Sequence, residues 1–195
     1  MSAKSTVDVV VIGAGPAGSA AAVTALANGA TVALVDKARF PRTKLCGGLI
    51  TGRCARHLKD VFGRDIEEPL FETRHNFEFF MDGERLADLR ETPSAHLTMR
   101  WDFDHVLFEQ ALSLGAQDLS GHRIEAIDLQ ASELRLIGGK TIQFQCLVGA
   151  DGVRSAVAEA LFGESYEPQK IGFALEIEDA SQKPDQDTPI RVDFA

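Results

Sequence analysis

Residues 7–36 read VDVVVIGAGPAGSAAAVTALANGATVALVD and decide how the chain begins to fold. The apolar, β-branched run at residues 7–13 predicts a strand that is buried on both faces. Residues 16–28 predict a helix with proline in its first turn, where a missing amide hydrogen costs nothing, and Gly29 ends it. A second apolar run at residues 31–36 predicts another strand. Strand, tight turn, helix and strand within about 30 residues predict a βαβ unit with parallel strands.

The turn in this unit is a glycine fingerprint, Gly-Ala-Gly-Pro-Ala-Gly at residues 13–18. Gly13 permits a tight turn after the strand, Gly15 lets the backbone approach a pyrophosphate, and Gly18 lets the helix pack closely against the strand. The start of the helix offers free N–H groups and the positive end of the helix dipole to phosphates. The fingerprint therefore predicts a dinucleotide site.

Asp36 strengthens this prediction because it ends the second strand, 18 residues beyond Gly18. An acid in this place can accept hydrogen bonds from ribose hydroxyls and disfavours a 2′-phosphate, so the tightly bound nucleotide should be NAD- or FAD-like rather than NADP. In the alternative interpretation, the glycines form a turn of an unrelated α/β fold, and Asp36 is a helix N-cap or pairs with Lys37.

A second motif, VGADGVRSAV, occupies residues 148–157. Asp151 and Gly152 follow an apolar strand, and a helix is predicted behind them with Ser155 at its start. A carboxylate there can order the phosphate side of a bound dinucleotide, and glycine permits close approach. Taken alone, the motif is better explained as an Asp-Gly turn that caps a strand. Its value as a cofactor signal lies in its combination with the fingerprint.

The composition excludes several classes of function. The 195 residues carry 20 basic and 29 acidic side chains, a formal net charge of −9, and such an acidic surface disfavours nucleic-acid binding. No apolar stretch approaches the roughly 20 residues that cross a bilayer, and the N-terminus does not resemble a signal peptide. Three cysteines without a C-x-x-C pair favour a reducing cytosol. The five histidines lack metal-ligand spacing, so no metal site is expected.

The rest of the chain mixes strands and helices, with a basic loop at residues 37–48. The hydrophobic periodicity and turn signals predict the following elements: a weak helix at residues 50–62, a hairpin at 75–90 around Asp82-Gly83, a short strand at 96–100, a helix at 102–114 with Asp102 as N-cap, a three-stranded antiparallel excursion around 122–145, a strand at 146–151, a short helix within 152–162, and two strands at 171–178 and 189–195 joined by a polar loop.

Together the two motifs resemble those of the flavoprotein hydroxylases in the para-hydroxybenzoate hydroxylase superfamily. The segment FPRTKLCGGL at residues 40–49 resembles the geranylgeranyl reductase branch, which has the form F-P-R-x-K-x-C-G-G. Residues 99–111, MRWDFDHVLFEQA, resemble the Arg-x-x-Phe-Asp helix entry of the same branch. The resemblance covers residues 7 to about 175. It implies an α/β fold with an FAD-binding, Rossmann-type parallel sheet, an antiparallel excursion and the start of a second sheet domain.

The resemblance also implies roles for individual residues. The FAD pyrophosphate would lie against the fingerprint, the adenosine ribose against the acid, and the flavin and ribityl chain beside the C-G-G backbone. An arginine would reach the phosphate or ribityl region, main-chain groups of an isoleucine would meet the adenine, and the aspartate of the second motif would serve both FAD and a visiting nicotinamide. These residues are, in that order, Gly13, Gly15, Ala17 and Gly18; Asp36; Cys46 and Gly47; Arg100; Ile124; and Asp151.

Four features of the sequence also have plainer explanations. Cys46 could be a small apolar residue without chemistry. Arg100 could pair on the surface with Asp102 or Asp104. The run of basic residues at 37, 39, 42 and 44 could be a solvated face, and Trp101 is better explained as a packing residue than as a substrate platform. No residue is predicted to be catalytic.

The implied activity is that of an FAD-dependent oxidoreductase. FAD would take hydride from NADH or NADPH, a transient donor, and the enzyme would reduce an isolated carbon–carbon double bond of a prenyl, geranylgeranyl-type substrate. The expected setting is cytoplasmic, with peripheral contact to a membrane from which the lipid substrate enters. Two alternatives stay open: a flavin monooxygenase or halogenase of the same superfamily, and a non-catalytic nucleotide-binding module.

The chain departs from the family in its length. Members are longer and carry a second cofactor motif, a Gly-Asp pair before a helix, and no such motif follows residue 175 here. We therefore expect an N-terminal part of a longer protein that binds FAD weakly by itself. Residues 1–168 would form an incomplete FAD/NAD(P)-binding domain, and residues 169–195 the beginning of a substrate domain.

Overall fold

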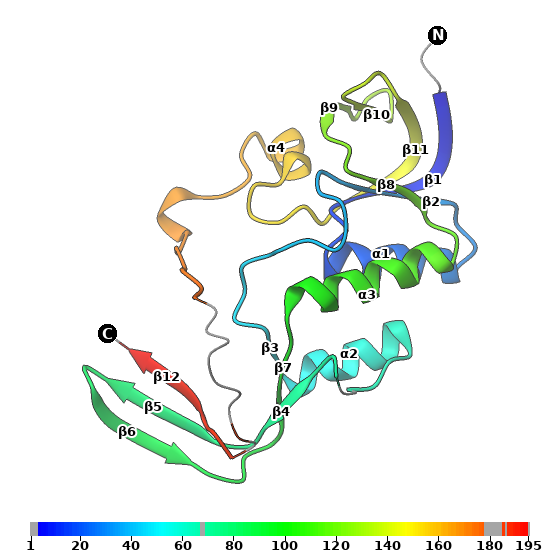
Figure 1. The fold of residues 1–195 in the computed structure, drawn as a ribbon. Coiled ribbons are helices and arrows are strands. Elements are labelled where there is room, and N and C mark those ends of the chain that lie inside the picture. The colour runs from blue at the N-terminus through cyan, green and yellow to red at the C-terminus, as the bar shows by residue number, and fades with distance from the viewer. Residues whose placement is uncertain (1–3, 67–68, 178–184, 186, 195) are drawn as a thin grey trace. The chain divides into compact units, whose positions relative to one another are not determined.

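The computed structural model (Figure 1) describes residues 4–66, 69–177, 185 and 187–194. By its internal contacts the chain forms two compact units. The first contains the described residues up to Thr43 together with Phe103–Phe173, and the second contains Lys44–Asp102 together with the described residues from Ala174 onward. The chain therefore passes between the units after Thr43, Asp102 and Phe173. The expected boundary after residue 168 concerns the domains of a whole flavoprotein and stays a prediction.

The first unit is built on a six-stranded sheet in the order β8-β2-β1-β11-β10-β9. Four strands, β8, β2, β1 and β11, are parallel; β10 continues the sheet antiparallel to β11, and β9 pairs antiparallel with β10. The strands are β1 (Lys4–Ile12), β2 (Val32–Asp36), β8 (Gln117–Ser120), β9 (Ile124–Asp128), β10 (Glu133–Leu136) and β11 (Thr141–Gly149). The α/β architecture with a parallel sheet, an antiparallel excursion and a second sheet region is confirmed.

One strand boundary was predicted wrongly. The expected third strand of the excursion and the expected strand at residues 146–151 are one strand, β11. Its first three residues pair antiparallel with β10, and β1 pairs parallel with it from Thr141 to Gly149. Residues 141–148 contain neither glycine nor proline, so nothing in the chain interrupts the strand.

The helices α1 (Pro16–Ala27) and α4 (Ala156–Phe162) contact this sheet. The helix α3 (Arg100–Ser113) contributes the buried residues Leu107 and Ala111. The predicted βαβ unit is present: β1 and β2 are parallel neighbours, α1 begins at Pro16, and Gly29 follows its end with a φ of +82°. Asp102 is not the N-cap of α3, because that helix already begins at Arg100 and Asp102 lies in its first turn. The core of this unit contains fully buried residues from four strands, Val10, Leu34, Leu134 and Ile142.

The described part of the second unit contains two small sheets and the helix α2. β12-β5-β6 form one sheet and β3-β7-β4 the other. The elements are β3 (Leu49–Ile50), α2 (Gly52–Phe62), β4 (Glu72–Arg74), β5 (Phe77–Met81), β6 (Glu84–Leu89), β7 (Ala95–Leu97) and β12 (Ile190–Phe194). The predicted hairpin is β5–β6, and Asp82 and Gly83 turn it with φ values of 50° and 81°.

The end of the chain only partly follows the predicted pattern. β12 lies within the expected strand at 189–195 and pairs parallel with β5, but residues 171–177 form no strand. Phe173 and Leu175 there are 97% and 85% exposed. Alternating apolar residues stabilise a strand only where another strand accepts their hydrogen bonds, and no described strand does so here. The polar loop expected between these strands lies largely outside the described residues.

None of the helices in the part of the chain that the structure describes combines the length and the apolar character needed to span a bilayer.

Candidate functional site

The fingerprint glycines are required by close backbone contacts. Gly13 has a φ of +95°, and a Cβ atom placed on it would lie 2.3 Å from the carbonyl oxygen of Ala150. A Cβ atom on Gly18 would lie 1.7 Å from the carbonyl oxygen of Gly13. Real side chains do not come this close, so both positions require glycine. The fingerprint thus touches the second motif, although the two lie far apart in the sequence.

Backbone hydrogen bonds hold the same corner. The amide of Gly13 donates to the carbonyl of Val35 at 2.7 Å, and the amide of Ala150 donates to the carbonyl of Ile12 at 2.7 Å. The fingerprint is therefore fixed to β2 on one side and to the end of β11 on the other. All of these groups lie at the carboxyl ends of parallel strands, where ligands bind in open α/β sheets.

The start of α1 is free to receive a ligand. Gly15 is its N-cap residue, no side chain caps the helix, and Pro16 occupies the first turn. The first amides of a helix have no acceptor within it, and an uncapped N-terminus next to a glycine loop favours phosphate groups. Ala17 and Gly18 belong to this first turn. The arrangement can accept a pyrophosphate.

Asp36, half-buried at the end of β2, organises the backbone around it. Its Oδ2 accepts from the amide of Ala14 at 2.9 Å, and its Oδ1 accepts from the amide of Ala38 at 2.8 Å. Neither alternative for this residue is observed: no helix begins after it, and within the described chain no ion pair with Lys37 is found. Each carboxylate oxygen can accept more than one hydrogen bond, so the predicted ribose contact remains open to it.

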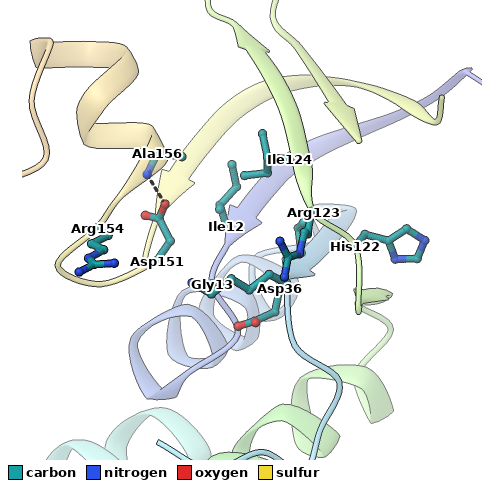
Figure 2. Close-up of a pocket in the computed structure, with 11 residues that line it drawn as sticks. Ile12, Gly13, Asp36, His122, Arg123, Ile124, Asp151, Arg154 and Ala156 are labelled. Carbon is teal, nitrogen blue, oxygen red and sulfur yellow. Dashed lines mark hydrogen bonds between the residues drawn. The ribbon is translucent and has the colours of Figure 1, made fainter. Parts of the chain in front are cut away.

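Asp151 organises the start of α4 in the same way. Its Oδ1 accepts from the hydroxyl of Ser155 at 2.6 Å, and its Oδ2 accepts from the amide of Ala156 at 2.6 Å, the dashed line in Figure 2. Ser155 in turn is the N-cap of α4 and accepts from the amide of Ala158 at 2.9 Å. Asp151 therefore caps the start of α4, as expected of a capping turn. It also lies beside Gly13 and lines the site.

A pocket of about 390 Å³ lies at this corner. It brings together four of the residues predicted from the sequence, Gly13, Asp36, Ile124 and Asp151 (Figure 2). The remaining lining residues were not predicted: Ile12, Val35, Lys37, His122, Arg123, Arg154 and Ala156. A pocket of this volume is within the range of small-molecule sites in proteins. Its position next to the fingerprint suits the adenosine end of a dinucleotide.

Three of the lining residues that the sequence did not predict are cationic. Lys37, Arg123 and Arg154 are exposed, and within the described residues their side chains form no ion pair. The ring of His122 points away from the other labelled side chains in Figure 2, with its Nδ1 3.2 Å from the carbonyl oxygen of Ser120. Lys37 follows a predicted strand, Arg123 adjoins Ile124 and Arg154 lies within the second motif, but nothing along the chain indicates that these cations face a cavity. Unpaired cations around a pocket favour an anionic ligand.

Three predicted residues belong to the second unit and are not part of this pocket. The thiol of Cys46 is exposed, and the backbone amide of Cys46 donates to Glu176 Oε2 at 3.0 Å. A Cβ atom on Gly47 would meet nothing within 4 Å, whereas one on Gly48, with a φ of +69°, would lie 2.2 Å from the carbonyl oxygen of Thr98. The structural need for glycine in the C-G-G segment therefore falls on Gly48. Arg100 is the first residue of α3.

Comparison with known proteins identifies the family. The sequence model described as "FAD dependent oxidoreductase" matches residues 8–130. Menaquinone reductase of Mycobacterium tuberculosis strain H37Rv is 33% identical over 183 residues, which cover 90% of this chain and 45% of that protein. Protein FixC of Escherichia coli strain K12 is 26% identical, over 79% of this chain and 38% of its own length. The chain thus spans less than half the length of these relatives.

Solved structures with the same fold include flavoproteins. PqsL of Pseudomonas aeruginosa, described as a probable FAD-dependent monooxygenase, superposes with a TM-score of 0.65 at 24% identity, over 83% of this chain and 47% of its own. Halogenase PltM in complex with phloroglucinol and FAD superposes with a TM-score of 0.67 at 20% identity, over 80% of this chain and 36% of its own. At these identities the likeness concerns the fold.

Proposed function

The chain belongs to the family of FAD dependent oxidoreductases, and from this membership we propose that its pocket and fingerprint hold the adenosine and pyrophosphate of FAD. The residues present fit that group. At Gly13 and Gly18 any Cβ atom would collide with the backbone, so only glycine allows the tight turn of the fingerprint, and α1 presents an uncapped N-terminus beside it. The observation that carries the proposal is the contact of Gly13 with Ala150 and Asp151, which joins both cofactor motifs around one pocket.

Each predicted residue has a place in this proposal. The amides around Gly13, Gly15, Ala17 and Gly18 would bind the pyrophosphate, and Asp36 would accept from the ribose hydroxyls. Main-chain groups of Ile124 would meet the adenine, while Asp151 orders the adjoining turn. We place Cys46, Gly47 and Arg100 at the flavin side. When bound, FAD supplies the hydride-transfer chemistry, and the protein orients it and excludes competing reactions.

For the reaction, we propose reduction of an isolated carbon–carbon double bond in a prenyl chain, with NADH or NADPH as the donor. Two observations support this choice: the C-G-G segment that resembles the geranylgeranyl reductase branch, and the name of the menaquinone reductases to which the chain is similar. A menaquinone is a quinone lipid that carries a prenyl chain, so both point to one chemical class of substrate. Such a substrate would be reached from a membrane surface by a protein that otherwise works in the cytoplasm.

The test begins with the purified protein and its visible spectrum. We expect uptake of added FAD, reduction of that FAD by NADH or NADPH without oxygen, and a mass gain of two hydrogen atoms in a prenyl lipid such as menaquinone. A colourless protein that does not take up added FAD would contradict the cofactor assignment and favour a nucleotide-binding module. Bound FAD without any change in the lipid would contradict the substrate assignment alone.

An oxygen-using reaction is the second candidate, because PqsL and PltM share this fold. The two candidates differ in how the reduced flavin behaves in air. Rapid oxidation of NADPH with release of peroxide in the absence of substrate would favour a monooxygenase or halogenase. A reduced flavin that persists in air would favour the reductase.

A further inference from the structure

Arg42 and Asp104 form an ion pair inside the first unit that the pocket does not use. Arg42 Nη1 lies 3.1 Å from Asp104 Oδ2, and the two side chains are 16% and 0% exposed. Arg42 Nη1 makes no hydrogen bond to another described residue, so charge rather than an aligned hydrogen bond holds it there. Two charges removed from water are often no more stabilising than apolar side chains of the same size. Stability alone therefore does not explain this pair.

Aromatic contacts hold the same loop to the same helix. The ring of Phe40 stacks on that of Phe108 with centroids 4.4 Å apart and an angle of 15°. The guanidinium carbon of Arg42 lies 4.8 Å from the centroid of Phe40. Asp104 and Phe108 are four residues apart on α3, so they face the same side of the helix. The loop after Asp36 is thus attached to α3 at two successive turns.

The pair lies where the chain leaves the first unit and returns to it. Arg42 comes directly before the passage after Thr43, and Asp104 comes directly after the passage at Phe103. The residues that we place at the flavin side follow at the same spacing: Cys46 is four residues after Arg42, and Arg100 is four residues before Asp104. The pair therefore joins the two segments that carry the flavin-side contacts.

We propose that Arg42 and Asp104 are positioning residues for the flavin half of the cofactor site. By holding these two segments of the first unit together, the pair fixes the two points from which the chain leads to Cys46 and to Arg100. The adenosine pocket does not need this pair, because Asp36 is held by its own bonds to the amides of Ala14 and Ala38. This inference rests on the proposed binding of FAD.

The test replaces the ion pair with apolar side chains in the double variant Arg42→Met/Asp104→Leu, which leaves no unpaired charge in the core. We expect the apoprotein to melt within about 4 °C of the wild type. The Kd for FAD should nevertheless rise about tenfold, because charge-assisted contacts of the flavin side lose their alignment. The circular dichroism of the bound flavin should change as well. Calorimetry, fluorescence titration with FAD and visible circular dichroism measure the three quantities.

The matched control is Lys4→Met/Glu133→Leu, which makes the same two changes at the ion pair of Lys4 and Glu133, 2.6 Å apart and much more exposed. It should alter neither the Kd nor the flavin signal. If Arg42→Met/Asp104→Leu keeps both at their wild-type values, or if FAD affinity falls only in step with the melting temperature, the positioning role is wrong. A wild type that binds no FAD would contradict the proposed function instead.

If the double variant does not fold, a milder variant tests the positioning role. Arg42→Lys keeps a charge opposite Asp104 but lacks the guanidinium plane over Phe40. We expect about a threefold rise in the Kd for FAD, with unchanged melting of the apoprotein. An unchanged Kd and an unchanged flavin signal in this variant would overturn the proposal.

Discussion

The corner around Gly13 and the segment Cys46–Gly48 are both proposed to hold FAD, but the protein builds them differently. At the corner, Asp36 and Asp151 engage both of their carboxylate oxygens with backbone amides or a hydroxyl. In Cys46–Gly48, Gly48 is fixed by the backbone of Thr98, while Cys46 and Gly47 remain exposed. At the adenosine end two carboxylates therefore hold the backbone, whereas in Cys46–Gly48 single hydrogen bonds hold Cys46 and Gly48.

Among the variants that test this difference between the two regions, Gly18→Ala should have the largest effect. Its Cβ atom would lie 1.7 Å from a backbone oxygen, which cannot move without shifting the fingerprint. We expect a loss of about 3–5 kcal/mol in the free energy of unfolding, measured with urea, and loss of FAD binding. The control is Gly29→Ala, where an added Cβ atom meets nothing within 4 Å and only the positive φ costs about 1–2 kcal/mol. Equal losses in both variants would show that the close approach is unimportant.

A matched pair of neighbours sharpens the comparison at the other end. Gly48→Ala places a Cβ atom 2.2 Å from the carbonyl oxygen of Thr98 at a φ of +69°. It should lower the free energy of unfolding by about 2–4 kcal/mol. Gly47→Ala meets no atom within 4 Å and should leave the stability within about 0.5 kcal/mol of the wild type. If thermal or urea unfolding ranks the two variants in the opposite order, the geometry of this segment is wrong.

Asp36→Ala tests whether the corner serves the ligand as well as the fold. Each hydrogen bond lost from a charged acceptor costs about 1.5–3 kcal/mol, so the Kd for FAD should rise at least about tenfold in a fluorescence titration. Asp36→Asn keeps one acceptor oxygen and should show a smaller rise. Unchanged FAD retention in Asp36→Ala would mean that this acid does not face the ribose.

The smallest effect is expected on β1 near the start of β2, where Asp8 accepts from the amide and hydroxyl of Thr31 at 2.8 and 2.6 Å. Hydrogen bonds from the Thr31 side chain and then its backbone lower the pKa of Asp8 below its ordinary value. A lowered folded-state pKa adds stability above the unfolded pKa of about 4, and that stability is lost as the pH falls through the folded pKa.

Urea unfolding of the wild type and Asp8→Asn at several pH values measures this effect. The wild type should be the more stable protein at neutral pH, and the difference should shrink as the pH falls below about 4. FAD affinity at neutral pH should not change in Asp8→Asn, because this residue does not line the pocket. A difference in stability that is independent of pH would contradict the role of the carboxylate charge.

Local sequence patterns predicted most elements of the fold. The run at residues 7–36 predicted β1, α1 and β2, and Asp82-Gly83 predicted the turn of the β5–β6 hairpin. The errors arose where a long-range partner decides the outcome. Residues 171–177 alternate like a strand but have no described strand beside them, and β11 is one strand because β1 pairs along all of it.

The sequence predicted only some of the residues of the candidate site, because long-range packing decides which side chains line it. Gly13, Asp36 and Asp151 were identified from motifs and Ile124 from the family resemblance, and the four residues line one pocket. Arg123 and Arg154 were missed as lining residues because no pattern along the chain shows which cations face a cavity. Arg42 was grouped with a basic run, and its burial against Asp104 depends on how a loop packs on a helix.

By itself, the sequence determined where strands, turns and helices form, since glycine, proline and the apolar period act on residues close together in the chain. It also determined that glycine and acid stand at the spacing of a dinucleotide fingerprint. Only the tertiary structure decided that Gly13 abuts Ala150, that Asp36 holds the amides of Ala14 and Ala38, and that Arg42 is buried against Asp104. These contacts join residues from 2 to 137 positions apart in the sequence. Most of them form only because the packing of the folded chain brings distant residues together.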